Sequence, residues 1–331
     1  MTRLGGLEHI QIQADDVELH LACLGEGPLV LMCHGFPGLW YSFRHQLPVL
    51  ADAGYRAVAM DMRGYGRSSR PRAVDAYGYD STARDVLAVL DYFGEERAVL
   101  IGHDFGANLA WHMAVHHPDR IRAVAALCVP YDMPLAGGTD VQPSTLYAEI
   151  GRDHFFHMHY YQQLQVPERN ACGREREFLV KLFWALSAEG DLLGWDSHPP
   201  QACYLDVLAQ PPTMPPWSWL SADDFDYYLE QYLTDDPELT FIGGINSYRA
   251  MDHNWEMFRD SAHAEVNVPA VFVGGAEDPV VKLGSDAAFT HMQNRVRDLR
   301  GMTLIDGAGH FIQQEQPGQL NRQLLAFLAS L

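Results

Sequence analysis

The aspartate at position 104 stands where a side chain can act as a nucleophile. It lies in the run Gly-His-Asp-Phe-Gly, between an apolar segment, 98–101, and a helical pattern, 105–116. A strand, a tight turn and a helix in this order expose the side chain at the tip of the turn, and the two glycines permit a strained backbone. The following helix directs its positive end at Asp104, which favours the ionised carboxylate.

A carboxylate in this position predicts displacement at carbon followed by hydrolysis of an ester. A serine that opened an epoxide would form an ether, which water does not easily cleave. An aspartate forms an ester instead, and water can hydrolyse that ester at its carbonyl. The carboxylate is also ionised at neutral pH and needs no base for the first attack. The plain alternative is that Asp104 only caps the helix that begins at Phe105.

Two later loops supply partners for this chemistry. The run Val-Phe-Val-Gly-Gly-Ala-Glu-Asp-Pro places Asp278 after a strand, and Gly-Ala-Gly-His-Phe places His310 after the last strand. A histidine can activate water against the ester, and an aspartate can fix the tautomer of the histidine and stabilise its imidazolium. Glu277 and Asp132 are rival orienting acids. Both rank lower, because Glu277 would point in another direction and Asp132 lies several residues beyond its strand.

A turn near the N-terminus offers backbone donors for the second step. His-Gly-Phe-Pro follows the apolar strand 29–33. The glycine in this turn leaves the amide of Phe36 free to donate. Together with the amide of Phe105, it is expected to form the oxyanion hole for ester hydrolysis.

The elements that must position these residues alternate along the first third of the chain. Short apolar runs are followed by segments of helical length with apolar residues three and four positions apart. This alternation predicts a mostly parallel sheet that is covered by helices on both faces. The expected strands are 18–24, 29–33, 56–60, 98–101, 123–127, 270–273 and 302–305, and the expected helices are 42–53, 81–93, 105–116 and 317–329.

The alternation of strands and helices stops between residues 134 and 258. This segment holds five of the seven tryptophans and eight of the fifteen tyrosines, and its helical pieces are not interleaved with strands. An aromatic, helical segment of this kind predicts an insertion packed over one end of the sheet. We therefore expect a core made of residues 1–133 and 259–331, with 134–258 as a helical lid.

Composition excludes several classes of protein. The chain has 331 residues, of which 47% are hydrophobic and 20% charged, so a real hydrophobic core is expected. Its net charge of −20 disfavours nucleic acid and anionic membranes as partners. The five cysteines show no CxxC spacing and the sixteen histidines have no ligand partners at a diagnostic spacing, so neither a disulfide scaffold nor a metal is expected. The absence of a membrane-length apolar run and of a signal-peptide pattern predicts a cytoplasmic protein.

These motifs together resemble the epoxide hydrolases of the α/β hydrolase fold. The resemblance rests on HGFPGLWYSFRHQLP, DMRGYGRSS, GHDFGA, CVPY, GGAEDPVV and GAGHF. It covers about residues 34–133 and 269–317, with thinner matches in the expected lid. Nucleophile, acid and histidine also follow one another in the order of this fold. The resemblance implies an α/β hydrolase core, and the aspartate in place of serine narrows it to epoxide hydrolases and the related dehalogenases.

The expected lid distinguishes these two families. In epoxide hydrolases, two lid tyrosines hydrogen-bond the epoxide oxygen and assist its opening, since a phenol can donate a proton at neutral pH. The run Phe-Phe-His-Met-His-Tyr-Tyr-Gln resembles the first such segment and indicates Tyr160, with Tyr161 as the alternative one residue later. The run Gly-Gly-Ile-Asn-Ser-Tyr-Arg resembles the second and indicates Tyr248. Either tyrosine alone is compatible with simple packing, but the presence of both favours a catalytic role.

Dehalogenases need side-chain donors that hold a halide. Haloalkane dehalogenases carry a tryptophan after the nucleophile and often an asparagine after His-Gly, where this chain has Phe105 and Phe36. Neither phenylalanine has a side-chain donor. Fluoroacetate-type dehalogenases carry an arginine after the nucleophile, which is also absent. Phe105 departs from the tryptophan usual in epoxide hydrolases as well, which should alter the shape of the pocket.

We therefore predict that the protein hydrolyses an apolar epoxide to a vicinal diol, with no metal or organic cofactor. Trp40 and Trp111 are further candidates for contact with the substrate. The expected partners are a small epoxide and water. The aromatic residues of the lid are also compatible with a homo-oligomer. Two alternatives remain. One is a dehalogenase with the same triad, and the other is a ligand-binding protein on a hydrolase scaffold, which would need none of the His–Asp geometry.

Overall fold

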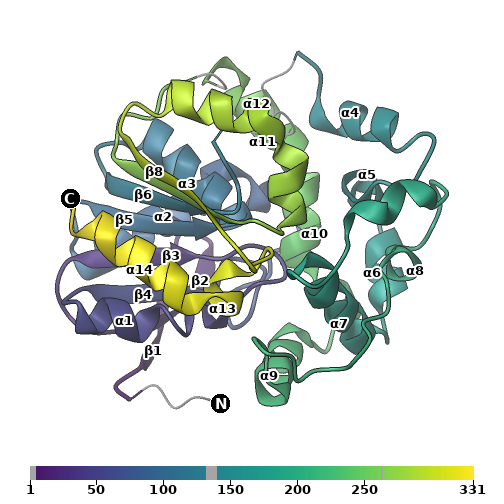
Figure 1. Cartoon of the computed structure of the whole chain (residues 1–331), viewed down its shortest axis with the longest axis horizontal. Coiled ribbons are helices and arrows are strands. Elements are labelled where there is room, and N and C mark those ends of the chain that lie inside the picture. The colour runs from purple at the N-terminus through teal and green to yellow at the C-terminus, as the bar shows by residue number, and fades with distance from the viewer. Residues whose placement is uncertain (1–4, 132–139, 262–263) are drawn as a thin grey trace.

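The computed structural model describes residues 5–131, 140–261 and 264–331, and within them eight strands form one sheet (Figure 1). The sheet order is β1-β2-β4-β3-β5-β6-β7-β8. Strand β2 runs antiparallel to both of its neighbours, and the strands from β4 to β8 are parallel, as predicted. The strands are β1 (Glu8–Ala14), β2 (Val17–Leu24), β3 (Leu29–Cys33), β4 (Arg56–Met60), β5 (Ala98–His103), β6 (Ile121–Leu127), β7 (Ala270–Gly275) and β8 (Leu299–Ile305).

The residue types of the strands follow their place in the sheet. The central strands β3, β5 and β7 are buried along their whole length, because elements pack on both of their faces. Edge strand β1, Glu-His-Ile-Gln-Ile-Gln-Ala, alternates polar and apolar residues and is largely exposed. The sequence analysis did not predict this strand.

Helices from the N-terminal and the C-terminal parts of the chain both pack on the sheet. Helix α3 contacts β3, β5 and β6 and packs beside α2, whereas α1 contacts β4 and β2, and α14 contacts β7 and β8 (Figure 1). The core helices are α1 (Leu47–Asp52), α2 (Tyr79–Phe93), α3 (Phe105–His116), α12 (Pro279–Arg295), α13 (Ile312–Glu315) and α14 (Pro317–Leu328), with short 3₁₀ turns η1 (Trp40–Phe43) and η2 (Asp75–Tyr77).

Strands β6 and β7 are joined by a long helical segment, α4 to α11, which we call the insertion. Figure 1 shows α4 to α9 gathered at one side of the sheet. The described part of this segment contains no strand, and both the expected boundary at residue 134 and the rival acid Asp132 lie outside the described residues. The helices are α4 (Pro143–Ile150), α5 (His157–Gln162), α6 (Val166–Ala171), α7 (Glu175–Leu186), α8 (Tyr204–Val207), α9 (Ala222–Tyr232), α10 (Ile242–Arg249) and α11 (Met251–Phe258), with 3₁₀ turns η4 (Leu193–Ser197), η5 (Pro237–Leu239) and η6 (Arg259–Ser261).

None of the helices in the described ranges combines the length and the apolar character that a membrane crossing requires.

Two glycines let helix α3 approach the sheet closely. A Cβ atom on Gly102 would lie 2.1 Å from the carbonyl oxygen of Gly106, and a Cβ atom on Gly106 would lie 2.1 Å from that of Cys33. Both distances are far below van der Waals contact. The turn between β5 and α3 is therefore packed so tightly that only glycine fits at these positions.

Replacement of Gly102 by alanine should destabilise the protein by about 1–3 kcal/mol, because backbone atoms must move to admit the methyl group. Gly284 is the matched control, since its Cβ would meet only the Cβ atom of Ala288 at 3.7 Å within helix α12. Gly284→Ala should stabilise by up to about 1 kcal/mol through helix propensity. Urea unfolding followed by circular dichroism measures both changes. A Gly102→Ala protein as stable as the wild type would contradict the packing described here.

Candidate active site

Asp104 sits at the turn between β5 and α3 in a conformation that L-residues rarely adopt. Its φ is 54° and its ψ is −119°. The amides of Ala107 and Asn108 donate to its carbonyl oxygen at 2.9 and 3.2 Å, and its own amide donates to Leu127 at 3.3 Å. The first turn of α3 and the end of β6 thus hold a strained backbone in place. The turn directs the carboxylate away from the strand and into the space under the insertion.

The two oxygens of the Asp104 carboxylate have different surroundings. Oδ1 accepts a hydrogen bond from the backbone amide of Phe36 at 2.9 Å, and the amide of Phe105 also bonds to this carboxylate. Oδ2 lies 3.7 Å from Nε2 of His310. Burial raises the pKa of Asp104, whereas His310 and the two amides act in the opposite direction. The two amides expected to form an oxyanion hole therefore meet at the carboxyl group of Asp104.

His310 is held by Asp278 in a buried pair. Nδ1 of His310 and Oδ2 of Asp278 are 3.0 Å apart, and Oδ1 of Asp278 accepts from the amide of Val280 at 2.8 Å, at the start of α12. Burial acts against the imidazolium, but the Asp278 carboxylate outweighs it and raises the pKa of His310 to about 9, with a further contribution from Asp104. The structure thus brings Asp104, His310 and Asp278 together. The rival Glu277 instead pairs with Lys282 at 2.6 Å on the surface.

A cavity of about 260 Å³ lies beside Asp104. Its lining is mainly apolar and aromatic, with Asn108 and His157 among its polar members. The lining residues are Asp104, Phe105, Asn108, Val129, Tyr147, Ile150, Phe156, His157, Met158, Trp195, Tyr248, Met251, Val280 and Leu283. A cavity of this size and character accommodates a small apolar molecule next to a charged nucleophile.

Tyr248 on α10 and Tyr161 on α5 form a stacked pair above this site. Their ring centroids are 4.6 Å apart and their planes differ by 8°. Tyr248 also contacts the ring of Phe105 edge-on at 4.9 Å, and Tyr161 contacts that of Phe36 edge-on at 6.4 Å. Burial raises the pKa of both tyrosines well above the ordinary value, so both phenols are protonated at neutral pH.

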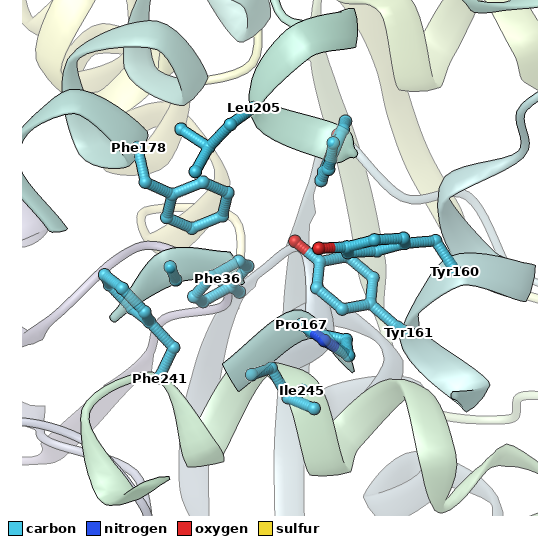
Figure 2. A pocket seen from close by; sticks show the side chains of 10 residues that line it. Phe36, Tyr160, Tyr161, Pro167, Phe178, Leu205, Phe241 and Ile245 are labelled. Carbon is cyan, nitrogen blue, oxygen red and sulfur yellow. The ribbon is translucent and has the colours of Figure 1, made fainter. Parts of the chain in front are cut away.

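Tyr160, the first choice from the sequence, has a different environment. Its hydroxyl accepts a hydrogen bond from Asn170 at 3.0 Å, whereas the buried hydroxyl of Tyr161 has no hydrogen-bond partner among the described residues. Figure 2 shows Tyr160 and Tyr161 beside Phe36 around a second cavity, of only about 10 Å³. The ring pairing with Tyr248 therefore favours the alternative register, with Tyr161 as the partner of Tyr248.

Comparison with known proteins identifies the family. The profile of the α/β hydrolase fold matches residues 28–317. Epoxide hydrolase A of Mycobacterium tuberculosis is 37% identical over 325 residues, which cover 97% of each chain. Epoxide hydrolase 3 of Siraitia grosvenorii is 33% identical and covers 97% of this chain and 98% of its own. The chain belongs to the epoxide hydrolases.

Solved structures of epoxide hydrolases agree with this assignment. Epoxide hydrolase A from Mycobacterium thermoresistibile superimposes with a TM-score of 0.88 at 36% identity and covers 98% of both chains. An epoxide hydrolase from an endophytic Streptomyces superimposes with a TM-score of 0.89, also at 36% identity, over 98% of this chain and 96% of its own. The fold class and the enzyme class predicted from the sequence are thereby confirmed.

The two tryptophans proposed to contact substrate do not line the cavity of this epoxide hydrolase. The indole of Trp40 donates to the hydroxyl of Tyr227 at 2.8 Å, and that of Trp111 donates to the carbonyl of Val129 at 3.1 Å. Neither tryptophan is among the described residues that surround the 260 Å³ cavity. Both are buried packing residues whose indole N–H groups already have partners, so we no longer expect either of them to contact the substrate.

Glu315 is a residue near the site that the sequence analysis missed. Its partly buried carboxylate accepts from the amides of Gly309 and Phe311 at 3.1 and 3.0 Å, on either side of His310, and from Ala188 in the insertion at 2.8 Å. Burial raises the pKa of Glu315 to about 7. The amide of His310 also donates to Leu186 at 2.9 Å. The loop that carries His310 is therefore fastened to the end of α7. In the sequence, the only sign of this contact is that an acidic residue stands five positions after His310.

Three buried groups, His310 among them, have the chemistry of metal ligands. Ligand atoms of His103, Cys128 and His310 lie within 4.8 Å of one another. Nε2 of His103 donates to the carbonyl oxygen of His310 at 2.7 Å, and Sγ of Cys128 lies 3.2 Å from the same oxygen. Burial lowers the pKa of His103 and raises that of the Cys128 thiol, so both groups are neutral. Their hydrogen bonds support the backbone of His310, and a bound metal would compete with these bonds.

The raised pKa of His310 predicts how the stability of this epoxide hydrolase depends on pH. Because the folded value, about 9, exceeds the ordinary 6.5, the imidazolium stabilises the fold fully below pH 6.5, and this contribution is lost as the pH rises through 9. It amounts to at most about 3 kcal/mol. Urea unfolding between pH 6 and 9.5 should show a decline that is larger in the wild type than in His310→Gln, in which Glu315 and the buried thiols still titrate. Parallel declines in the two proteins would refute the assignment.

Proposed function

We propose that this epoxide hydrolase converts apolar epoxides to vicinal diols through a covalent ester on Asp104. The observation that carries the proposal is the asymmetry of the Asp104 carboxylate, with Oδ1 bound by the amide of Phe36 and Oδ2 facing His310. One oxygen is held where negative charge will develop, and the other is available for attack. The substrates are a small apolar epoxide, as the lining of the 260 Å³ cavity supports, and water.

The first step opens the epoxide ring. Oδ2 of Asp104 attacks a ring carbon, and the carbon–oxygen bond breaks with its electron pair on the ring oxygen. This oxygen takes a proton from the phenol of Tyr161 or Tyr248. Burial keeps both phenols protonated, which leaves them able to donate when the ring oxygen becomes basic. The products of this step are a hydroxyalkyl ester on Asp104 and one tyrosinate, which regains its proton from water.

The second step hydrolyses the ester. His310 removes a proton from a water molecule, and the oxygen of that water attacks Cγ of Asp104. Oδ1 then carries the negative charge, which the amides of Phe36 and Phe105 stabilise. Collapse of the tetrahedral intermediate releases the diol, whose oxygen takes the proton back from His310. The carboxylic acid left on Asp104 then ionises, and its proton neutralises the hydroxide that formed when water reprotonated the tyrosinate. Neither step requires a metal or an organic cofactor.

Charge couples the two steps. Asp104 is one of the groups that raise the pKa of His310 in the free enzyme. Formation of the ester removes the negative charge of Asp104, so the pKa of His310 falls at the stage at which it must act as a base. Asp278 stays beside Nδ1 and continues to orient the ring.

His310→Gln should stop the reaction at the ester. Glutamine cannot act as the base, so incubation with styrene oxide should increase the intact mass by one substrate, and peptide mapping should place the adduct on Asp104. The wild type should release phenylethanediol continuously, and the variant at a rate lower by 10²-fold or more.

Asp104→Asn, which lacks the nucleophile, is the control and should show no adduct. A 1-haloalkane tests the dehalogenase alternative, and we expect no halide release because the side chains of Phe36 and Phe105 carry no donor. Halide release without diol, or an adduct on another residue, would overturn the proposal.

Phenylalanine replacements test the assignment of the two tyrosines. Tyr161→Phe and Tyr248→Phe should each slow ester formation roughly 10-fold or more, and the double variant roughly 10²-fold or more, because the acid is lost while the ring is kept. Tyr160→Phe is the matched control and should react within about twofold of the wild type. Rapid-quench mass spectrometry of the ester measures these rates. A slow Tyr160→Phe beside a normal Tyr161→Phe would restore the first register.

A further inference from the structure

The two tyrosines proposed as acids belong to separate helices of the insertion. Tyr161 is the fifth residue of the six-residue helix α5, and Tyr248 is next to the last residue of α10. Stacking at 4.6 Å with planes 8° apart requires that the two helix ends keep a fixed position relative to each other. Ring contact alone does not supply that restraint, because stacked rings slide past each other at little cost.

The residues that follow the two tyrosines restrain the two helix ends through reciprocal hydrogen bonds. Gln162 follows Tyr161, and its Nε2 donates to the carbonyl oxygen of Tyr248 at 3.0 Å. Arg249 follows Tyr248, and its Nε donates to the carbonyl oxygen of Tyr161 at 3.0 Å. Each tyrosine carbonyl is therefore bonded to the side chain that adjoins the other tyrosine.

Arg249 also satisfies the end of α5. One of its terminal nitrogens, Nη2, donates to the carbonyl oxygen of Gln163 at 2.7 Å. The last carbonyl groups of a helix have no partner within the helix, and a cation is favourable at that end. The guanidinium of Arg249 thus binds the carbonyls of Tyr161 and Gln163 at the C-terminal end of the helix that carries Tyr161.

Glu168 on α6 fixes the orientation of Arg249. Its two carboxylate oxygens accept from Nη1 at 2.6 Å and from Nη2 at 3.2 Å. The side chains are only 8% and 13% exposed, so the bonds are shielded from water. A pair of hydrogen bonds between a guanidinium and a carboxylate sets the plane of the guanidinium as well as its position.

We propose that Gln162 and Arg249, the latter oriented by Glu168, are positioning residues that hold Tyr161 and Tyr248 in the register needed to protonate the epoxide oxygen. The inference rests on the proposed acid role of the two tyrosines. It predicts an effect on ring opening alone, because Asp278, His310 and the amides of the oxyanion hole are carried by other elements.

The test measures the two chemical steps separately. Ester formation is followed by rapid-quench mass spectrometry in the His310→Gln background, in which the ester accumulates, and ester hydrolysis is followed in single turnovers with His310 intact. Gln162→Leu and Arg249→Lys should slow ester formation roughly 10-fold, as expected for a misplaced acid, and leave hydrolysis within about twofold. Lysine keeps the charge beside Glu168 but cannot make the several directed hydrogen bonds of the guanidinium. An Arg249→Lys protein that forms the ester at the normal rate would therefore contradict the proposal.

Gln142→Leu is the matched control. Gln142 lies in the same insertion and donates one side-chain hydrogen bond, to Glu256 at 3.2 Å near the surface, so its loss should change neither step. If Arg249→Lys fails to fold, Gln162→Leu still decides the question, because it removes one neutral amide whose other hydrogen bond, to the carbonyl of Met158 at 3.2 Å, lies within its own helix.

A double-variant comparison separates positioning from general support of the fold. In the Tyr161→Phe, Tyr248→Phe background, Gln162→Leu should cause no further loss in ester formation, since no phenol remains to be positioned. A further loss of the full 10-fold would show a merely structural role. If the tyrosine variants themselves react normally, the proposed acids are wrong. If they are slow while Gln162→Leu and Arg249→Lys are normal, only the positioning inference fails.

Discussion

A carboxylate that is removed from bulk water must be compensated by fixed donors, and the placement of Asp104 depends on this requirement. The desolvation of an unpaired ion costs several kcal/mol, which no aromatic lining offsets. The compensation comes from the amide of Phe36, the amide of Phe105 and the imidazole of His310. The first amide follows β3 and the carboxylate follows β5, and these strands are parallel neighbours with Cys33 opposite Gly102. Adjacent strand ends thus bring donor and acceptor within 2.9 Å.

The same arrangement is repeated further along the sheet. Asp278 follows β7 and His310 follows β8, and these two strands are also parallel neighbours, with Gly275 opposite Ile305. The site is therefore assembled from two pairs of strand ends, with β6 between them. The chemistry of the core is a consequence of strand order, whereas the tyrosines depend on contacts between short helices of the insertion.

This difference explains what could be predicted from the sequence. Asp104, His310, Asp278 and Phe36 all stand within five residues after the end of a strand, where a local pattern carries over to the sheet edge. The choice between Tyr160 and Tyr161 could not be made in that way. Both are buried aromatic residues in a helix of six residues, and only the packing of α5 on α10 distinguishes their directions.

Other differences have similar physical origins. Strand β1 was missed because its polar alternation lies on an exposed edge, where burial does not select apolar residues. Helix α12 was missed because its sequence contains a glycine and several β-branched residues, which are weak helix formers. Glu315 was missed because an isolated acid in a short helical turn is typical of a surface, and only the converging amides reveal its burial.

The attachment of the His310 loop to the end of α7 limits how the insertion can move. From the insertion, the amide of Ala188 binds Glu315 and the carbonyl of Leu186 binds the amide of His310, so the insertion cannot move away at α7 without displacing the base. The most exposed residue of the cavity lining, Leu283 at 41%, belongs to α12, which takes no part in this attachment. Movement of the insertion beside α12 would therefore leave the base in place.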